Sequence, residues 1–201
     1  VKANGKFRHA DDGPEAPLDS ESNSFGEVVR ALKARHGLDA VLCWQAMAGY
    51  WSGLMPGAPG VAAFAPEVRF PRPSPGILAV DASMRYVHPA VVGLGLPRDP
   101  RALHAAMHAY LAACGVDGCK CGVQATVAMF GWASGGAAAT AARYHASLED
   151  SAARHFPGNA VLNSMCCAIE DLYNLKHSCV ARVGEVLTVV FKPLIIYLFY
   201  F

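Results

Sequence analysis

Two sets of side chains in this sequence have the types and spacing to hold a metal ion. His104 and His108 are four residues apart, and two imidazoles at this spacing share one face of a helix and can bind zinc. Ala105 stands where a metalloprotease helix of the His-Glu-x-x-His type carries its catalytic glutamate. We therefore interpret the two histidines as half-exposed residues of a helix.

The second set consists of four cysteines, Cys119, Cys121, Cys166 and Cys167. They fall at the ends of neighbouring predicted strands, where thiolates could converge on a metal ion. The Cys-x-Cys and Cys-Cys spacings differ from those of zinc knuckles, however, and a buried cysteine behaves by default as a small hydrophobic residue. We expect no bound metal and no cofactor, and keep a thiolate metal-binding module as the third of three functional hypotheses.

Helices that alternate with short apolar strands must position these residues. A capping box, Ser24 with Glu27, predicts the start of the first helix, and Asp99 followed by Pro100 predicts the start of the second. The predicted helices cover 24–37, 99–115 and roughly 136–155, and the predicted strands cover 39–44, 116–121, 160–166 and 179–183. This alternation indicates an α/β protein built from parallel βα units.

The segments around these units differ from them in composition. Residues 45–98 hold eight of the 13 prolines and show no sustained period, so we predict one long loop of the kind that carries an active site. Residues 1–23 are predicted to be a polar loop, 24–186 the α/β domain, and 187–201 an apolar tail. Part of that tail could fold back as an edge strand, although Pro193 would interrupt its ladder of hydrogen bonds.

The overall composition excludes several classes of protein. Hydrophobic residues make up 53% of the 201 residues and charged residues 16%, which is enough apolar material for a core and excludes a disordered chain. The 17 basic and 16 acidic residues give a net charge of +1 with no basic run, so no nucleic-acid partner is expected. The apolar run 194–201 is far shorter than the roughly 20 residues of a membrane span. The sequence has seven cysteines and shows no secretory signal, which predicts an intracellular, most simply cytoplasmic, location.

Several motifs in one order carry a resemblance to a known family. They are 44–51 (Trp-Gln-Ala-Met-Ala-Gly-Tyr-Trp), 74–76 (Ser-Pro-Gly), 93–96 (Gly-Leu-Gly-Leu), 107–111 (Met-His-Ala-Tyr-Leu) and 115–120 (Gly-Val-Asp-Gly-Cys-Lys). Over about residues 2–182 the sequence resembles the plant raffinose synthases, seed-imbibition proteins and alkaline α-galactosidases of glycoside hydrolase family thirty-six. The resemblance implies a (β/α)8 TIM-type barrel, of which this chain would form a part of about four strands. Its catalytic groups would lie at the carboxyl ends of the strands.

The sequence departs from the family at the positions that perform the chemistry. Transfer of a galactosyl unit with retention needs a carboxylate nucleophile and a second carboxyl group as acid/base. By the resemblance, Gly122 stands at the position of the nucleophile, and Val186 stands at the acid/base position with Glu185 beside it. Asp117 lies five residues before Gly122, on the order of 16 Å along a strand, and cannot replace the nucleophile. No catalytic residue is therefore intact.

Part of a sugar pocket is nevertheless expected to remain. By the resemblance, Trp44 and Trp51 would stack on a galactose ring, and Lys120 and Arg182 would contact the ligand. Each residue also has a structural alternative: the tryptophans as core or loop anchors, the lysine as a surface residue, and the arginine as an ion-pair partner.

Two main hypotheses for function follow. The first is a truncated, inactive relative of the galactinol–sucrose galactosyltransferases and alkaline α-galactosidases, whose ligands are the α-galactosides galactinol and raffinose together with sucrose. The alternative is a non-catalytic galactoside-binding or regulatory remnant that associates with an intact relative.

Overall fold

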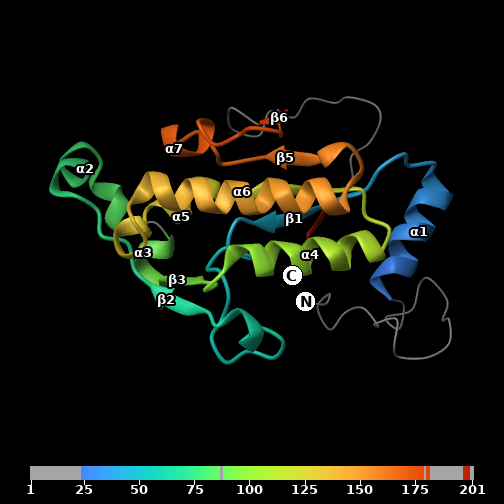
Figure 1. The fold of residues 1–201 in the computed structure, drawn as a ribbon, viewed down its shortest axis with the longest axis horizontal. Helices are drawn as coiled ribbons and strands as arrows, with labels where there is room; N and C mark the ends of the chain where they lie inside the picture. Colours follow the sequence, from blue (N-terminus) through green and yellow to red (C-terminus); the bar gives the residue numbers. More distant parts are fainter. Residues whose placement is uncertain (1–23, 87, 179, 182–196, 200–201) are drawn as a thin grey trace.

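The computed structural model of the chain describes residues 24–86, 88–178, 180–181 and 197–199. Its centre is a parallel sheet with the strand order β6-β5-β4-β1-β7 (Figure 1). The strands are β1 (Leu42–Ala46), β4 (Gly118–Gly122), β5 (Val161–Asn163), β6 (Val180–Ala181) and β7 (Tyr197–Phe199). The α/β class and the parallel pairing predicted from the sequence are confirmed by this sheet.

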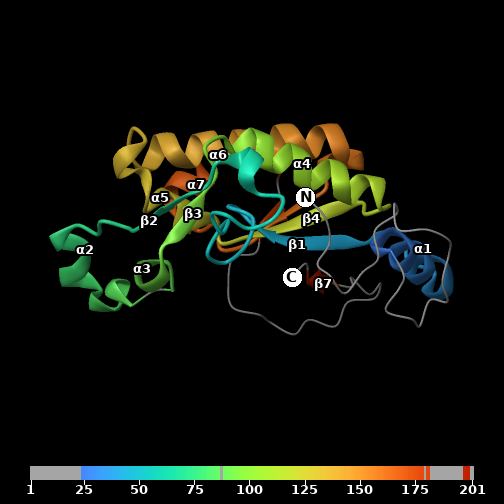
Figure 2. The same cartoon turned by 90° about the horizontal axis from the view of Figure 1, so that it is seen from below.

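Two long helices cover one face of the sheet. They are α4 (Pro100–Ala113) and α6 (Ala137–His155), and Figure 2 shows both on the same side of β1 and β4. The core lies between these layers and contains buried side chains from all of them, including Cys43, Cys119, Leu111 and Leu148. In the same view (Figure 2), no described helix lies over the opposite face of β1 and β4.

The helix boundaries follow the local signals in the sequence. The first helix is α1 (Phe25–His36), where the Ser24 hydroxyl accepts a hydrogen bond from the Glu27 backbone N–H and the Glu27 carboxylate accepts one from the Ser24 N–H. Gly37, at φ 60°, closes the helix in the left-handed region that favours glycine. The Asp99 carboxylate caps α4 by accepting from the Arg101 N–H, with Pro100 at the first helical position.

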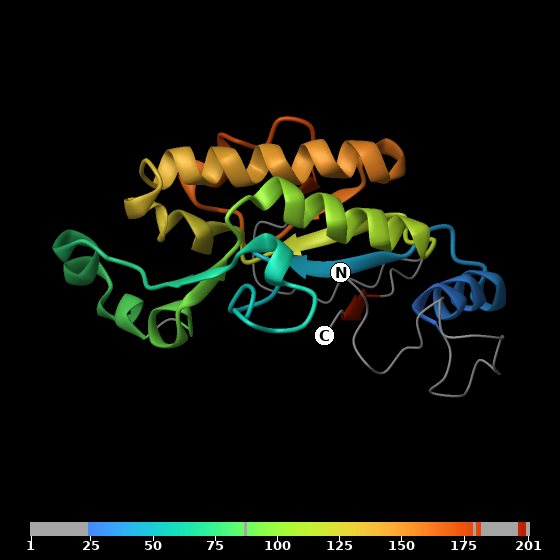
Figure 3. The ribbon, with the colours of Figure 1, turned by 60° about the horizontal axis from the view of Figure 1, so that its bottom comes forward.

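The prediction of one long loop over 45–98 is wrong, because this segment contains short regular elements. β2 (Glu67–Arg69) pairs antiparallel with β3 (Leu94–Leu96), and between them an arm projects from the molecule (Figure 3). The arm holds α2 (Pro75–Val80), η3 (Ala82–Arg85) and α3 (His88–Val92), and η2 (Ala62–Phe64) precedes β2. These elements have three to six residues, too few for a hydrophobic period to be visible.

The remaining short elements connect the strands to their neighbours. α5 (Gln124–Ala128) and η4 (Gly131–Ala133) follow β4, η5 (Pro157–Asn159) precedes β5, and α7 (Ile169–Leu172) lies between β5 and β6. The strands begin and end one to three residues away from the predicted limits. In the predicted tail, 197–199 form the edge strand β7 beside β1, while the other residues of 187–201 lie outside the described residues. No helix in the described part of the chain has the length and apolar character needed to cross a membrane.

A buried carboxylate fixes the segment that leads into β6. Glu149, on α6, is 2% exposed and accepts hydrogen bonds from the backbone N–H groups of Lys176, His177 and Ser178. It also accepts one from the Ser178 hydroxyl, at 2.6 Å. Burial alone would raise the pKa of this carboxyl, but the hydroxyl and the three N–H groups outweigh burial and hold the pKa below its usual value. The carboxylate therefore stays charged at neutral pH.

We predict that Glu149→Gln lowers the free energy of unfolding by about 2 kcal/mol, because an amide N–H₂ group replaces one oxygen of an acceptor that serves four donors. The measurement is urea denaturation at pH 7 followed by circular dichroism. Asp150→Asn removes an exposed carboxylate from the next position and should change the stability by less than about 0.5 kcal/mol. Equal effects of the two substitutions would contradict the role assigned to Glu149.

Candidate functional site

The carboxyl ends of β1 and β4 bring two of the predicted ligand residues together. Trp44 pairs with Lys120 and Ala46 with Gly122 in the register of the two strands. Residues two apart on a strand point to one face, so Trp44, Ala46, Lys120 and Gly122 share the face opposite to α4 and α6. Lys120 is half-buried there beside Trp44.

A tight turn returns the chain so that a second tryptophan reaches the first. Ala46 and Gly49 exchange backbone hydrogen bonds of 3.2 and 2.9 Å, with Gly49 at φ 100°. The ring centroids of Trp44 and Trp51 are then 5.6 Å apart, with an angle of 27° between the planes. Trp44 is 6% exposed and Trp51 44% exposed, so the pair leads from the interior to the surface. Aromatic faces of this kind can stack on the apolar face of a sugar ring.

The space around Gly122 is occupied by its neighbours. A Cβ atom added to Gly122 would lie 2.7 Å from the terminal methyl group of Met165 and 2.9 Å from Nε1 of Trp44. Such distances are below van der Waals contact, so any side chain at this position would require both neighbours to move. The indole and the thioether therefore fill the volume in which a side chain at 122 would lie.

The backbone is strained where β4 and β5 end. Val123 has φ 56° and Met165 has φ 54°, values that are uncommon for residues other than glycine and most unfavourable for a β-branched valine. Hydrogen bonds hold the strained segments, from the Met47 N–H to the Gly122 carbonyl at 2.9 Å and from the Ala125 N–H to the Met165 carbonyl at 3.0 Å. Strain of this kind concentrates at functional sites.

The alternate residues of β1 and β4 face the core and cannot contact a ligand on the open face. Gln45 lies with its amide nitrogen 3.0 Å from Nε2 of His108. Cys119 and Cys121 are fully buried, and burial raises the pKa of the Cys121 thiol to about 12. Both thiols are therefore protonated at neutral pH, as expected of small hydrophobic residues.

The two candidate metal-binding histidines are core residues, and the prediction that they are half-exposed is wrong. His104 and His108 are both 0% exposed, because their face of α4 packs against α6 and the end of β1. The His104 ring lies 2.8 Å from the Ser147 hydroxyl and 2.9 Å from the Met47 carbonyl. Within the described ranges, no group of three or more His, Cys, Asp or Glu side chains is arranged to hold a metal ion.

Comparison with known proteins decides the family. The model of a family described as raffinose synthase or seed imbibition protein Sip1 matches residues 1–189. The chain belongs to the raffinose synthase family. The resemblance inferred from the motifs at 44–51 and 115–120 is thereby confirmed.

Three relatives in the raffinose synthase family show what share of a whole family member this chain covers. It is 34% identical to the probable galactinol–sucrose galactosyltransferase 1 of Arabidopsis thaliana over 188 residues, 92% of this chain and 25% of the relative. It is 39% identical to the galactinol–sucrose galactosyltransferase of Oryza sativa subsp. japonica over 169 residues, 80% of this chain and 21% of the relative. It is 29% identical to the stachyose synthase of Pisum sativum over 152 residues, 74% of this chain and 18% of the relative. The chain thus spans a quarter or less of these curated relatives.

The other predicted site residues fall into two groups. Arg182, Glu185 and Val186 lie outside the described residues, so their predicted roles stay predictions. Asp117 is a structural residue at the opposite end of β4: its carboxylate lies 2.7 Å from Nζ of Lys33 on α1 and accepts a hydrogen bond from the Val41 N–H, also at 2.7 Å. It joins α1 to β1 and cannot reach the carboxyl ends of the strands.

Sequence reasoning missed the buried amides that connect the ends of the strands. The Gln124 amide nitrogen donates to the Cys121 carbonyl at 2.9 Å and to Oδ1 of Asn163 at 2.8 Å, and the Asn163 amide donates to the Ser178 hydroxyl at 2.9 Å. Further from the site, His145 and Asp171 form a fully buried pair, with Nε2 and Oδ1 3.0 Å apart. Asn163 is a polar residue within a predicted apolar strand, and this contrast is the sequence signal that could have identified it.

We predict that acid destabilises the fold through the two core histidines. Burial lowers the pKa of His104 to about 4 and that of His108 to about 3. These pKa values lie below the ordinary value of about 6.5, so the unfolded chain binds protons that the folded chain excludes. The free energy of unfolding should have its full value above pH 6.5. As the pH falls from 6.5 toward 4, it should decrease by about 1.4 kcal/mol per pH unit for each histidine.

The measurement is urea denaturation at pH values from 7.5 to 4.5. His108→Gln should reduce the slope of the free energy of unfolding against pH by about half. A wild-type stability that does not change between pH 6.5 and 5 would show that the core histidines are not held neutral.

Proposed function

We propose that the chain binds an α-galactoside at the carboxyl ends of β1 and β4 without transferring the galactosyl unit. The observation that carries this proposal is the occupied space at Gly122, the position where the family resemblance places the nucleophile. Glycine supplies no carboxylate, and the Trp44 indole and the Met165 methyl group crowd the position that the Cβ atom of a side chain would take. A glycosyl-enzyme intermediate cannot form without the nucleophile.

The arrangement of the sheet supports a part of a (β/α)8 barrel as its context. β1, β4, β5 and β6 are parallel and neighbour one another in chain order, and the two long helices lie on one face. In the wall of a barrel, the strand order runs in one direction and the helices cover one face. In a doubly wound sheet, the strand order reverses and helices cover both faces. In a barrel, the face with Trp44 and Lys120 would point into the interior.

The ligand class follows from the relatives and from the side chains that remain. The relatives are named as galactinol–sucrose galactosyltransferases and a stachyose synthase, so α-galactosides such as galactinol and raffinose, together with sucrose, are the proposed ligands. Trp51 offers an exposed aromatic face and Lys120 a charged hydrogen-bond donor on the same face of the site. An intracellular, cytoplasmic location is also proposed, supported by the buried, reduced thiols of Cys43, Cys119, Cys121 and Cys166.

We predict that the chain releases no product from galactinol, raffinose or an aryl α-galactoside above a heat-inactivated control. Gly122→Asp should also be inactive and should destabilise the fold by about 1 to 3 kcal/mol, because the new side chain overpacks against Trp44 and Met165. Product release and thermal unfolding are the measurements. Turnover by the unmodified chain would refute the proposal, and turnover by Gly122→Asp would show that only the nucleophile is missing.

We predict further that raffinose binds in isothermal titration calorimetry and that Trp51→Ala weakens its binding at least tenfold by removing the stacking surface. Trp132→Ala is the matched control, because Trp132 is 47% exposed against 44% for Trp51 but lies on η4, away from the paired tryptophans. Equal losses in the two variants, or no binding by the unmodified chain, would contradict the proposed site.

A further inference from the structure

A second site is formed where three segments distant in sequence enclose a cavity of about 320 Å³. β2 contributes Glu67 and Arg69, the turn from β3 into α4 contributes Arg98, and the start of α6 with the turn before it contributes Ser134, Arg143 and Tyr144. None of these residues belongs to the open face of β1 and β4. The volume lies at the lower end of the roughly 300 to 1,000 Å³ that small-molecule sites occupy.

The cavity concentrates positive charge in a chain that is nearly neutral overall. Three arginines line it against one carboxylate, while the whole chain has 17 basic and 16 acidic residues. Glu67 neutralises only Arg69, with Oε2 2.8 Å from Nη2. Within the described part of the chain, Arg98 and Arg143 have no carboxylate partner. Like charges that converge on one cavity repel each other, and a bound anion would relieve this repulsion.

The side chains around the arginines favour an anion with several acceptor oxygens. Nη1 of Arg69 donates to the Ser134 hydroxyl at 3.0 Å, which together with Glu67 fixes the plane of its guanidinium group. Burial raises the pKa of Tyr144, and the charges of Arg143 and Arg69 act in the opposite direction without reversing the shift. The phenol is therefore a neutral O–H donor at the wall of the cavity.

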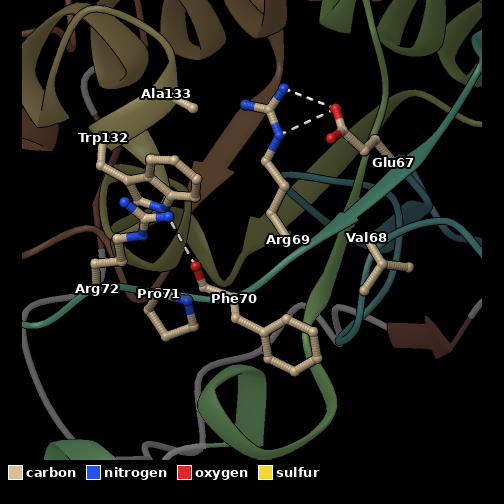
Figure 4. A pocket seen from close by; sticks show the side chains of 8 residues that line it. All are labelled: Glu67, Val68, Arg69, Phe70, Pro71, Arg72, Trp132 and Ala133. Atoms are coloured by element: carbon tan, nitrogen blue, oxygen red, sulfur yellow. Dashed lines mark hydrogen bonds and ion pairs between the residues drawn. The ribbon is translucent and has the colours of Figure 1, made fainter.

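The neighbouring cavity on the other side of Glu67 and Arg69 lacks this excess of unpaired charge. Figure 4 shows Arg72 stacked on Trp132, and its guanidinium carbon is 3.5 Å from the centre of the ring. The Trp132 indole N–H in turn donates to the Phe70 carbonyl at 3.2 Å. Arg72 is thus stacked closely on an aromatic face, whereas the guanidinium carbon of Arg143 lies 5.9 Å from the centre of the Tyr144 ring, and Arg98 and Arg143 are both exposed.

We propose that the cavity lined by Arg69, Arg98 and Arg143 binds a phosphate group, carried by inorganic phosphate or by a small phosphate ester. A planar guanidinium group presents paired N–H donors that match two oxygens of a phosphate, which explains why several arginines serve this ligand better than one. This site is separate from the proposed galactoside site. A bound phosphate would contact three segments at once: β2, the turn that precedes α4, and helix α6.

The test is isothermal titration of the 201-residue chain with sodium phosphate at constant ionic strength, with sodium chloride as the reference titrant. Saturable binding to one site is expected with phosphate and not with chloride. The double variant Arg98→Ala, Arg143→Ala should weaken the binding at least tenfold, and Arg98→Lys, Arg143→Lys should retain part of it, because lysine keeps the charge but loses the paired donors. Arg154→Ala, at an exposed arginine about three turns further along α6, should bind as the unmodified chain does.

Titration with glucose 6-phosphate distinguishes the two sources of the phosphate group. Tighter binding of glucose 6-phosphate than of inorganic phosphate identifies an ester as the ligand, and the reverse order identifies inorganic phosphate. The proposal is overturned if phosphate gives no saturable signal, or if the double alanine variant binds phosphate as well as the Arg154→Ala control does.

Discussion

The alternation of side chains along β1 and β4 is the constraint on which the rest of the structure depends. One face of these strands is buried under α4 and α6, and the other carries the candidate site. A shift of the pairing by one residue would exchange the two faces, placing Trp44 and Lys120 in the core and Gln45 and Cys121 on the open face. The core therefore fixes the register, and the register in turn fixes which residues a ligand can reach.

Buried polar groups inside this core also fix the positions of the strand ends. Gln124 connects β4 to β5 through Asn163, and Glu149 connects α6 to the segment before β6. The Gln124 amide nitrogen and the Glu149 carboxylate are buried and would be costly to leave without hydrogen-bond partners, so they favour this arrangement of their neighbours. The strained backbone at Val123 and Met165 lies next to Gln124 and is held by the backbone hydrogen bonds of Gly122 with Met47 and of Met165 with Ala125.

The long helices could be predicted from the sequence because their signals are local. Ser24 with Glu27, and Asp99 with Pro100, specify helix starts through contacts within four residues. The predicted ends of the strands were less accurate, because strand ends depend on pairing between distant segments. Ala46, for example, belongs to β1 only because it pairs with Gly122. The elements within 45–98 could not be predicted, because β2 exists through the pairing of Glu67 with Leu96. In the site, the family motif predicted Trp44 and Lys120 as ligand residues, but nothing in their spacing indicated that the indole lies against Gly122.

Glycine at the end of β4 determines how the neighbouring side chains of the site pack. A side chain at this position would lie within 3.0 Å of Nε1 of Trp44 and of the terminal methyl group of Met165, and such overpacking costs stability. Glycine removes that cost and lets both groups pack against the backbone, leaving Trp44 6% exposed. Trp44 is therefore packed like a core residue, and the exposed ring of Trp51 remains as the surface on which a sugar could stack.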